Sequence, residues 1–97
     1  MKQVMVRYRV KPEAAAENER LVRAVYAALE RERPDDLRYR TVVLDDGLTF
    51  VHTAGVEGDG TPLSDLEAFR AFQADIAGRC DEPPVVSDVR EIGAYGV

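Results

Sequence analysis

His52 is the only histidine of the 97-residue chain, so it carries the only side chain with an unperturbed pKa near neutrality. It lies two residues beyond Phe50 in an alternating segment, and both side chains therefore fall on one face of a strand. There His52 could act as a general base toward an acidic phenol. The alternative is a core histidine that hydrogen bonds to a hydroxyl such as that of Thr41 or Tyr8.

Asn18 occupies a position where helical spacing calls for an apolar residue. Ala14, Leu21 and Val25 lie four residues before it and three and seven residues after it, so Asn18 falls on or near their stripe. A buried amide needs hydrogen-bond partners. It could orient a substrate carbonyl or hydroxyl and stabilise an oxyanion, or it could simply bond neighbouring backbone or water. His52 and Asn18 are the two candidate catalytic residues.

Aromatic side chains could line a pocket for a planar ligand. The candidate ligand-binding residues are Tyr8, Phe50, Phe69 and Phe72, and Tyr26 and Tyr39 could join them. The same spacing is typical of a plain hydrophobic core. One histidine without a companion histidine, cysteine or carboxylate cluster is a poor metal-ligand set, and the glycine-rich residues 55–62 lack the lysine of a phosphate-binding loop. We therefore expect neither a metal nor a cofactor.

The composition indicates one globular domain, residues 1–97, with 45% hydrophobic and 32% charged residues. A net charge of −5 argues against nucleic acid or an anionic membrane surface as the main partner. The apolar runs are too short to span a bilayer. Cys80 is the only cysteine and cannot form an intrachain disulfide, which fits a reducing cytoplasm.

The elements that must position these side chains centre on residues 37–54, which read as a β-hairpin. Asp46-Gly47 between alternating apolar segments favours a two-residue type I′ turn. That turn places Val43 opposite Phe50 and Thr41 opposite His52.

The remaining chain supplies two helices and two further strands. The alternation predicts strands over 3–10 and 85–92, and apolar periodicity predicts helices over 13–33 and 63–77. Ser64 and Glu67 have the spacing of a capping box, and Gly78 is placed to end the second helix. The order β-α-β-β-α-β predicts an α+β, ferredoxin-like fold, in which a four-stranded antiparallel sheet has both helices on one face.

The sheet face opposite the helices is expected to be too apolar for water. It would carry apolar and basic side chains: Met5, Arg7, Arg9, Arg38, Arg40, Val42, Leu44 and Val51. Such a patch usually marks an interface. We expect a homodimer in which two sheets pack face to face.

The sequence resembles the dimeric α/β-barrel superfamily, in particular the antibiotic-biosynthesis-monooxygenase-like domains. The resemblance rests on a strand ending in Val10-Lys11-Pro12, a helix with Glu17-Asn18-Glu19, the hairpin end Thr49–His52, the aromatic helix segment Phe69–Phe72 and a closing strand. It implies a twofold dimer and a pocket between sheet and helices. Some members oxidise aromatic polyketides with oxygen and no cofactor, and others degrade haem. This chain lacks the tryptophan of the former and a histidine on the second helix like that of the latter.

These observations favour a dimeric α/β-barrel protein that binds a small aromatic ligand. One alternative is a cofactor-independent monooxygenase acting on a phenolic or quinone-like compound, with His52 taking the proton and Asn18 stabilising the oxyanion. The other is a dimeric scaffold without ligand chemistry.

Overall fold

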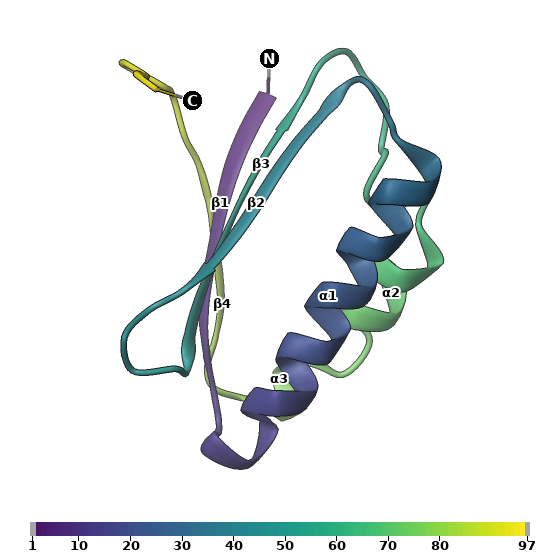
Figure 1. Ribbon diagram of the computed structural model, residues 1–97. Coiled ribbons are helices and arrows are strands. Elements are labelled where there is room, and N and C mark those ends of the chain that lie inside the picture. Colours follow the sequence, from purple (N-terminus) through teal and green to yellow (C-terminus); the bar gives the residue numbers. More distant parts are fainter. Residues whose placement is uncertain (1, 97) are drawn as a thin grey trace.

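The computed structural model describes residues 2–96, which form two layers (Figure 1). One antiparallel sheet has the order β2-β3-β1-β4, built from β1 (Lys2–Val10), β2 (Leu37–Val43), β3 (Thr49–Val56) and β4 (Cys80–Asp88). The helices, all on one side of this sheet, are the short 3₁₀ turn η1 (Pro12–Ala14), α1 (Ala15–Glu32), α2 (Glu67–Gln73) and α3 (Ile76–Arg79). The predicted α+β, ferredoxin-like fold is confirmed.

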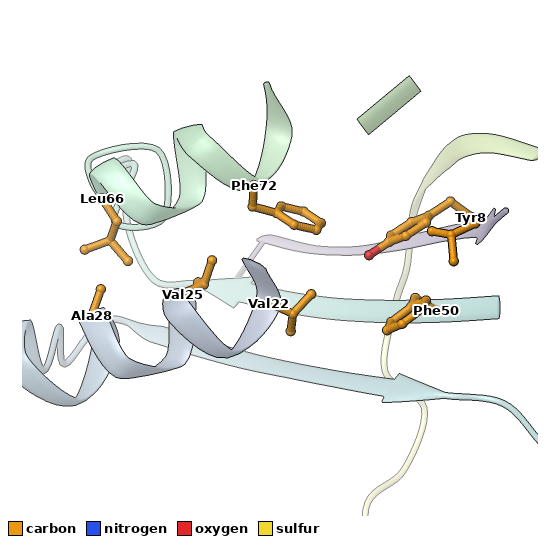
Figure 2. Close-up of a cluster of buried hydrophobic side chains, with 8 residues drawn as sticks. Tyr8, Val22, Val25, Ala28, Phe50, Leu66 and Phe72 are labelled. Atoms are coloured by element: carbon orange, nitrogen blue, oxygen red, sulfur yellow. The ribbon is translucent and has the colours of Figure 1, made fainter. Parts of the chain in front are cut away.

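The core lies between the sheet and the helices. Figure 2 shows Tyr8 and Phe50 of the sheet together with Val22 and Val25 of α1 and Phe72 of α2. Tyr8 lies opposite Phe50 in the β1–β3 ladder, and Thr41 lies opposite His52 in the β2–β3 ladder. The hairpin register predicted from the sequence is therefore correct, and it brings His52 to the helix side of the sheet.

The turn of the hairpin differs from the predicted type I′. Such a turn needs positive φ at both central residues, whereas here only Gly47 has a positive φ, of 70°. The Gly47 amide donates to the Leu44 carbonyl, so the turn is centred one residue earlier. The Asp46 carboxylate instead accepts from the amides of Leu48 and Thr49 and from the Thr49 hydroxyl, which holds its pKa at about 2.

The second predicted helix is shorter and is broken in two. It begins at Glu67 after Leu66, whose side chain makes no capping bond, so the capping box predicted at Ser64 is wrong. Residues 74–75 interrupt it, and Gly78 lies inside α3 rather than at a helix end. A β-carbon at Gly78 would come within 2.8 Å of the Asp75 carboxylate, so this glycine permits the close approach of that side chain.

The last strand begins five residues earlier than predicted. β4 runs from Cys80 to Asp88 and includes Pro83 and Pro84, while residues 89–96 have no regular structure. Prolines are tolerated here because β4 is an edge strand and its pairing with β1 shifts register near Arg9.

α1 follows the predicted helix closely, apart from its first turn, which is 3₁₀. Its buried residues are Asn18, Val22, Val25 and Ala28, so Val22 belongs to the buried stripe of α1. Within residues 2–96, every helix is too short or too polar to cross a membrane.

Candidate functional site

A chain of hydrogen bonds between side chains crosses the core at His52. The Asn18 Nδ2 of α1 donates to the Tyr8 Oη of β1 over 2.9 Å. Tyr8 Oη in turn lies 2.8 Å from His52 Nε2 on β3. The two candidate catalytic residues are thus joined through the hydroxyl of a third candidate residue.

The chain continues from His52 to the β2 edge of the sheet. His52 Nδ1 lies 2.7 Å from Tyr39 Oη and 3.0 Å from Thr41 Oγ1. Thr41 Oγ1 is 2.8 Å from the Tyr26 Oη of α1. Three consecutive strands and α1 therefore hold these groups, because alternation along each strand turns them all toward the helices.

Arg79 closes the chain at its other end. Its Nε donates to Asn18 Oδ1 over 3.1 Å, and its Nη2 donates to the Phe72 carbonyl over 2.7 Å. The guanidinium also lies over the Phe72 ring, 5.5 Å from the centroid. We call the series from Arg79 through Asn18, Tyr8, His52, Tyr39 and Thr41 to Tyr26 the polar chain.

Burial keeps the polar chain free of titration near neutral pH. The side chains of Asn18, Tyr8 and His52 are at most 4% exposed. Removal from water lowers the pKa of His52 to about 4 and raises the pKa of the Tyr8 and Tyr39 hydroxyls well above the usual value. A neutral imidazole therefore lies between protonated phenols.

Three of the four candidate ligand-binding residues lie in the core. The Tyr8 ring stacks on Phe50 at 5.6 Å with 5° between the planes and packs against Phe72 at 6.2 Å. Figure 2 shows these rings within the layer between sheet and helices. Phe69 differs, because it lines a cavity of about 430 Å³ together with Val4 and the loop before α2.

A groove of about 480 Å³ opens between α1 and β2, at the Tyr26 end of the polar chain. Its walls and rim are Tyr26, Leu29, Glu30, Arg33, Pro34, Asp35, Leu37 and Tyr39. The Tyr26 and Tyr39 rings stack at 5.3 Å, and Phe69 meets Tyr39 edge-on at 6.3 Å. Phe69 therefore packs against the groove's wall from the side of the other cavity.

No group of three or more histidine, cysteine, aspartate or glutamate side chains within residues 2–96 could hold a metal ion. His52 already has oxygen partners at both ring nitrogens, Tyr8 on one side and Tyr39 and Thr41 on the other. These residues therefore give no support to a metal centre around the histidine.

Solved structures match the chain over nearly its whole length. One described as an antibiotic biosynthesis monooxygenase has a TM-score of 0.70 at 21% identity, covering 96% of this chain and 100% of its own. Rv0793 from Mycobacterium tuberculosis has a TM-score of 0.72 at 16% identity and 98% coverage of both chains. SnoaB from Streptomyces nogalater, described as a cofactor-independent oxygenase, gives 0.62 at 15% identity and 93% coverage of both. The chain has the fold of the antibiotic-biosynthesis-monooxygenase-like proteins.

This likeness is one of fold, since no family model and no curated protein matches the sequence. Within the antibiotic-monooxygenase-like fold, the structure joins His52 and Asn18 through the Tyr8 hydroxyl. It also adds Arg79, which no sequence pattern singled out. The one available signal was the need of a buried Asn18 amide for a partner, and that need does not point to a residue 61 positions away.

Proposed function

We propose that this protein binds a small planar aromatic molecule in the groove between α1 and β2. One observation carries the proposal: Tyr26 and Tyr39 belong both to the groove wall and to the polar chain that contains His52. A ligand in the groove would therefore contact hydroxyls whose orientation is set from the core. Asn18 and His52 are almost fully buried. A ligand could therefore reach either of them directly only if Tyr8 or Tyr39 moved aside.

The groove suits such a ligand in size and chemistry. Its volume of about 480 Å³ lies within the range of small-molecule pockets. The apolar side chains of Leu29 and Leu37 and the stacked phenol rings offer flat contact surface, and the hydroxyls offer polar contacts. The lining also includes the charged residues Glu30, Arg33 and Asp35, so the groove favours a flat molecule with a polar edge.

We expect 9-fluorenone, a planar aromatic ketone, to bind in this groove. At about 100 times its dissociation constant it should add about 2.7 kcal/mol to the free energy of unfolding, visible as a rise in Tm. Tyr26→Ala should weaken binding measured by isothermal titration calorimetry, because it removes a wall and a hydroxyl of the groove. Tyr95→Ala is the matched control, since Tyr95 is fully exposed on the C-terminal segment. Equal affinities for the two variants would refute this site.

A cofactor-independent monooxygenase is the second candidate function. It is favoured by the hydrogen-bonded contact of His52, Tyr8 and Asn18 and by the described activity of SnoaB, which shares the fold. A phenolic substrate would lose its proton to His52 through the intervening hydroxyls only after these reversed their hydrogen bonds and His52 Nδ1 gave up its own proton. Anthrone and oxygen test this: quinone absorbance should appear with the wild type and not with His52→Ala. Binding of fluorenone without any oxidation of anthrone would refute the monooxygenase function and support the binding function.

We further propose that two copies pack through the sheet face that the helices leave open. In Figure 1 the helices α1, α2 and α3 lie on one side of the sheet. The other side exposes Met5, Val42, Leu44 and Val85, each by 39% or more. Exposed apolar side chains gathered on the open face of a sheet are typical of an interface.

Sedimentation should therefore give the mass of two chains. Val42→Asp should yield single chains, because a buried unpaired carboxylate at the interface would cost several kcal/mol. Val86→Asp is the control: Val86 is also exposed but lies opposite Val6, on the helix side of the sheet, and should leave the dimer intact. A wild type that remains a single chain at every concentration would refute the interface.

A further inference from the structure

Arg79 is a buried cation whose hydrogen bonds go to neutral groups, Asn18 and the Phe72 carbonyl. The hydrogen bond from Arg20 lowers the pKa of the Glu17 carboxyl, and the charge of Arg79 also helps to lower it. Arg79 is 8% exposed, and the ion pairs found within residues 2–96 join other arginines to glutamates on the surface. Its contacts are the Asn18 amide oxygen, the Phe72 carbonyl and the Phe72 ring. Burying a guanidinium costs free energy that an apolar residue would avoid. The hydrogen bonds of Arg79 compensate for part of this cost.

The Arg79 guanidinium fixes the orientation of the Asn18 amide. A guanidinium only donates, so the Asn18 atom that faces it must be the oxygen. The Asn18 NH₂ group then faces Tyr8, and it also only donates. The Tyr8 oxygen is therefore an acceptor from Asn18, and its own hydrogen is directed to the acceptor 2.8 Å away, His52 Nε2.

The same direction continues through His52 to the groove. With Nε2 accepting, the proton of the imidazole is on Nδ1, which faces Tyr39 Oη and Thr41 Oγ1. A protonated Nδ1 cannot accept, so Thr41 Oγ1 has the Tyr26 and Tyr39 hydroxyls as its acceptors, and Tyr26 Oη is 2.8 Å away. When Thr41 donates to Tyr26, the Tyr26 hydroxyl keeps its own hydrogen for another acceptor, and the Tyr26 ring borders the groove.

We propose that Arg79 is a positioning residue that sets the direction of the whole polar chain, keeps the His52 proton on Nδ1, and makes Tyr26 a hydrogen-bond donor toward the groove. The groove consequently takes its ligand through an acceptor oxygen, such as an aromatic carbonyl or a phenolate. The part concerning the ligand rests on the function proposed above. The part concerning His52 does not.

The hydrogen bonds of the polar chain could point in the opposite direction if residue 18 offered only acceptors. Asn18→Asp does this with almost no change of shape, and it gives the buried Arg79 a carboxylate partner. The carboxylate would accept from the Tyr8 hydroxyl, and Tyr8 would then accept from a proton on His52 Nε2. Thr41 and Tyr26 would reverse as well, leaving the oxygen of Tyr26 to face the groove without its hydrogen.

The tautomer of His52 tests the role of Arg79 without any ligand. Because the chain has one histidine, a long-range ¹H–¹⁵N spectrum of the labelled protein at pH 7 reports this residue alone. We expect a protonated Nδ1 and an unprotonated Nε2 in the wild type, and the reverse in Asn18→Asp. Arg79→Met should populate both forms, whereas Arg20→Met, at an exposed arginine of α1, should keep the wild-type spectrum. A proton on Nε2 in the wild type, or an unchanged tautomer in folded Asn18→Asp and Arg79→Met, would overturn the proposal.

A pair of flat tricyclic probes tests the donor at the groove. 9-Fluorenone carries only an acceptor, and carbazole of nearly the same shape carries only an N–H donor. The wild type should prefer fluorenone by about fivefold, the effect of one hydrogen bond, and Asn18→Asp should move this ratio toward carbazole. An equal preference in both proteins would overturn the donor assignment of Tyr26. If neither probe bound while the tautomers were as expected, the groove would fail as a ligand site and the role of Arg79 would stand.

Discussion

Replacing Tyr8 by phenylalanine is expected to lower the free energy of unfolding by about 3 kcal/mol. The change removes one oxygen from a residue that is 1% exposed and leaves the ring stack with Phe50 in place. It leaves Asn18 Nδ2 and His52 Nε2 without their shared partner, in a site closed to water. Each unpaired buried group costs about 1–3 kcal/mol. Urea denaturation at pH 7 measures the loss.

Tyr26→Phe provides the matched comparison. It removes the same atom from the other end of the polar chain, where the hydroxyl has Thr41 as its partner and the ring borders the groove. Water can replace the lost contact there, so we expect a loss of less than about 1 kcal/mol. Similar losses for the two variants would show that the polar chain is not closed to water at Tyr8.

The large expected effect of Tyr8→Phe comes from a residue whose position the sequence predicted well. Alternation in residues 3–10 and in the hairpin placed Tyr8, Phe50 and His52 among side chains expected to face the helices, although a register slip by one residue would have exchanged the two faces. The structure has Tyr8, Phe50 and His52 on that side. Successive side chains of a strand point to opposite faces of the sheet. A two-residue periodicity can therefore be recognised in a single sequence.

Local features that compete with periodicity were harder to predict. The last strand was placed too late because Pro83-Pro84 reads as a break, and only the edge position of β4 makes these prolines acceptable. The second helix was predicted as continuous from its apolar periodicity, whereas the structure interrupts it at residues 74–75.

In the candidate site, too, periodicity predicted some residues, and others depend on the tertiary structure. The burial of Asn18 and the contacts of His52 with Tyr8 and Thr41 follow from helix and strand spacing, and both were among the sequence-based expectations. Arg79 follows from neither, because it lies beyond the helix interruption, where the periodicity of α2 no longer applies. A charged residue at the end of a short helix usually faces water. At the end of α3, Arg79 instead points into the core and donates a hydrogen bond to the Phe72 carbonyl.

The polar chain makes the core dependent on a neutral histidine. Burial holds the pKa of His52 at about 4, against 6.5 in the unfolded chain. Above pH 6.5 the imidazole is neutral in both states and contributes no pH dependence. Between 6.5 and 4 only the unfolded chain binds the proton, so the unfolded state gains stability as the pH falls. At about 1.4 kcal/mol per pKa unit, the free energy of unfolding should drop by about 3 kcal/mol across this window.

Urea denaturation of the wild type and of His52→Gln over pH 7 to 4 separates this effect from the titration of carboxylates. The glutamine variant starts from a lower stability, but it lacks the only histidine of the sequence, so its curve should decline less between pH 6.5 and 5 than that of the wild type. Below pH 5 the carboxylates act on both proteins alike. Parallel curves throughout, or an NMR titration of the single histidine with a midpoint near 6.5, would mean that the folded protein accepts a charged His52. The hydrogen bond between Tyr8 and His52 would then have to break or reverse, because a protonated imidazole donates from both nitrogens and Nε2 could no longer accept from Tyr8.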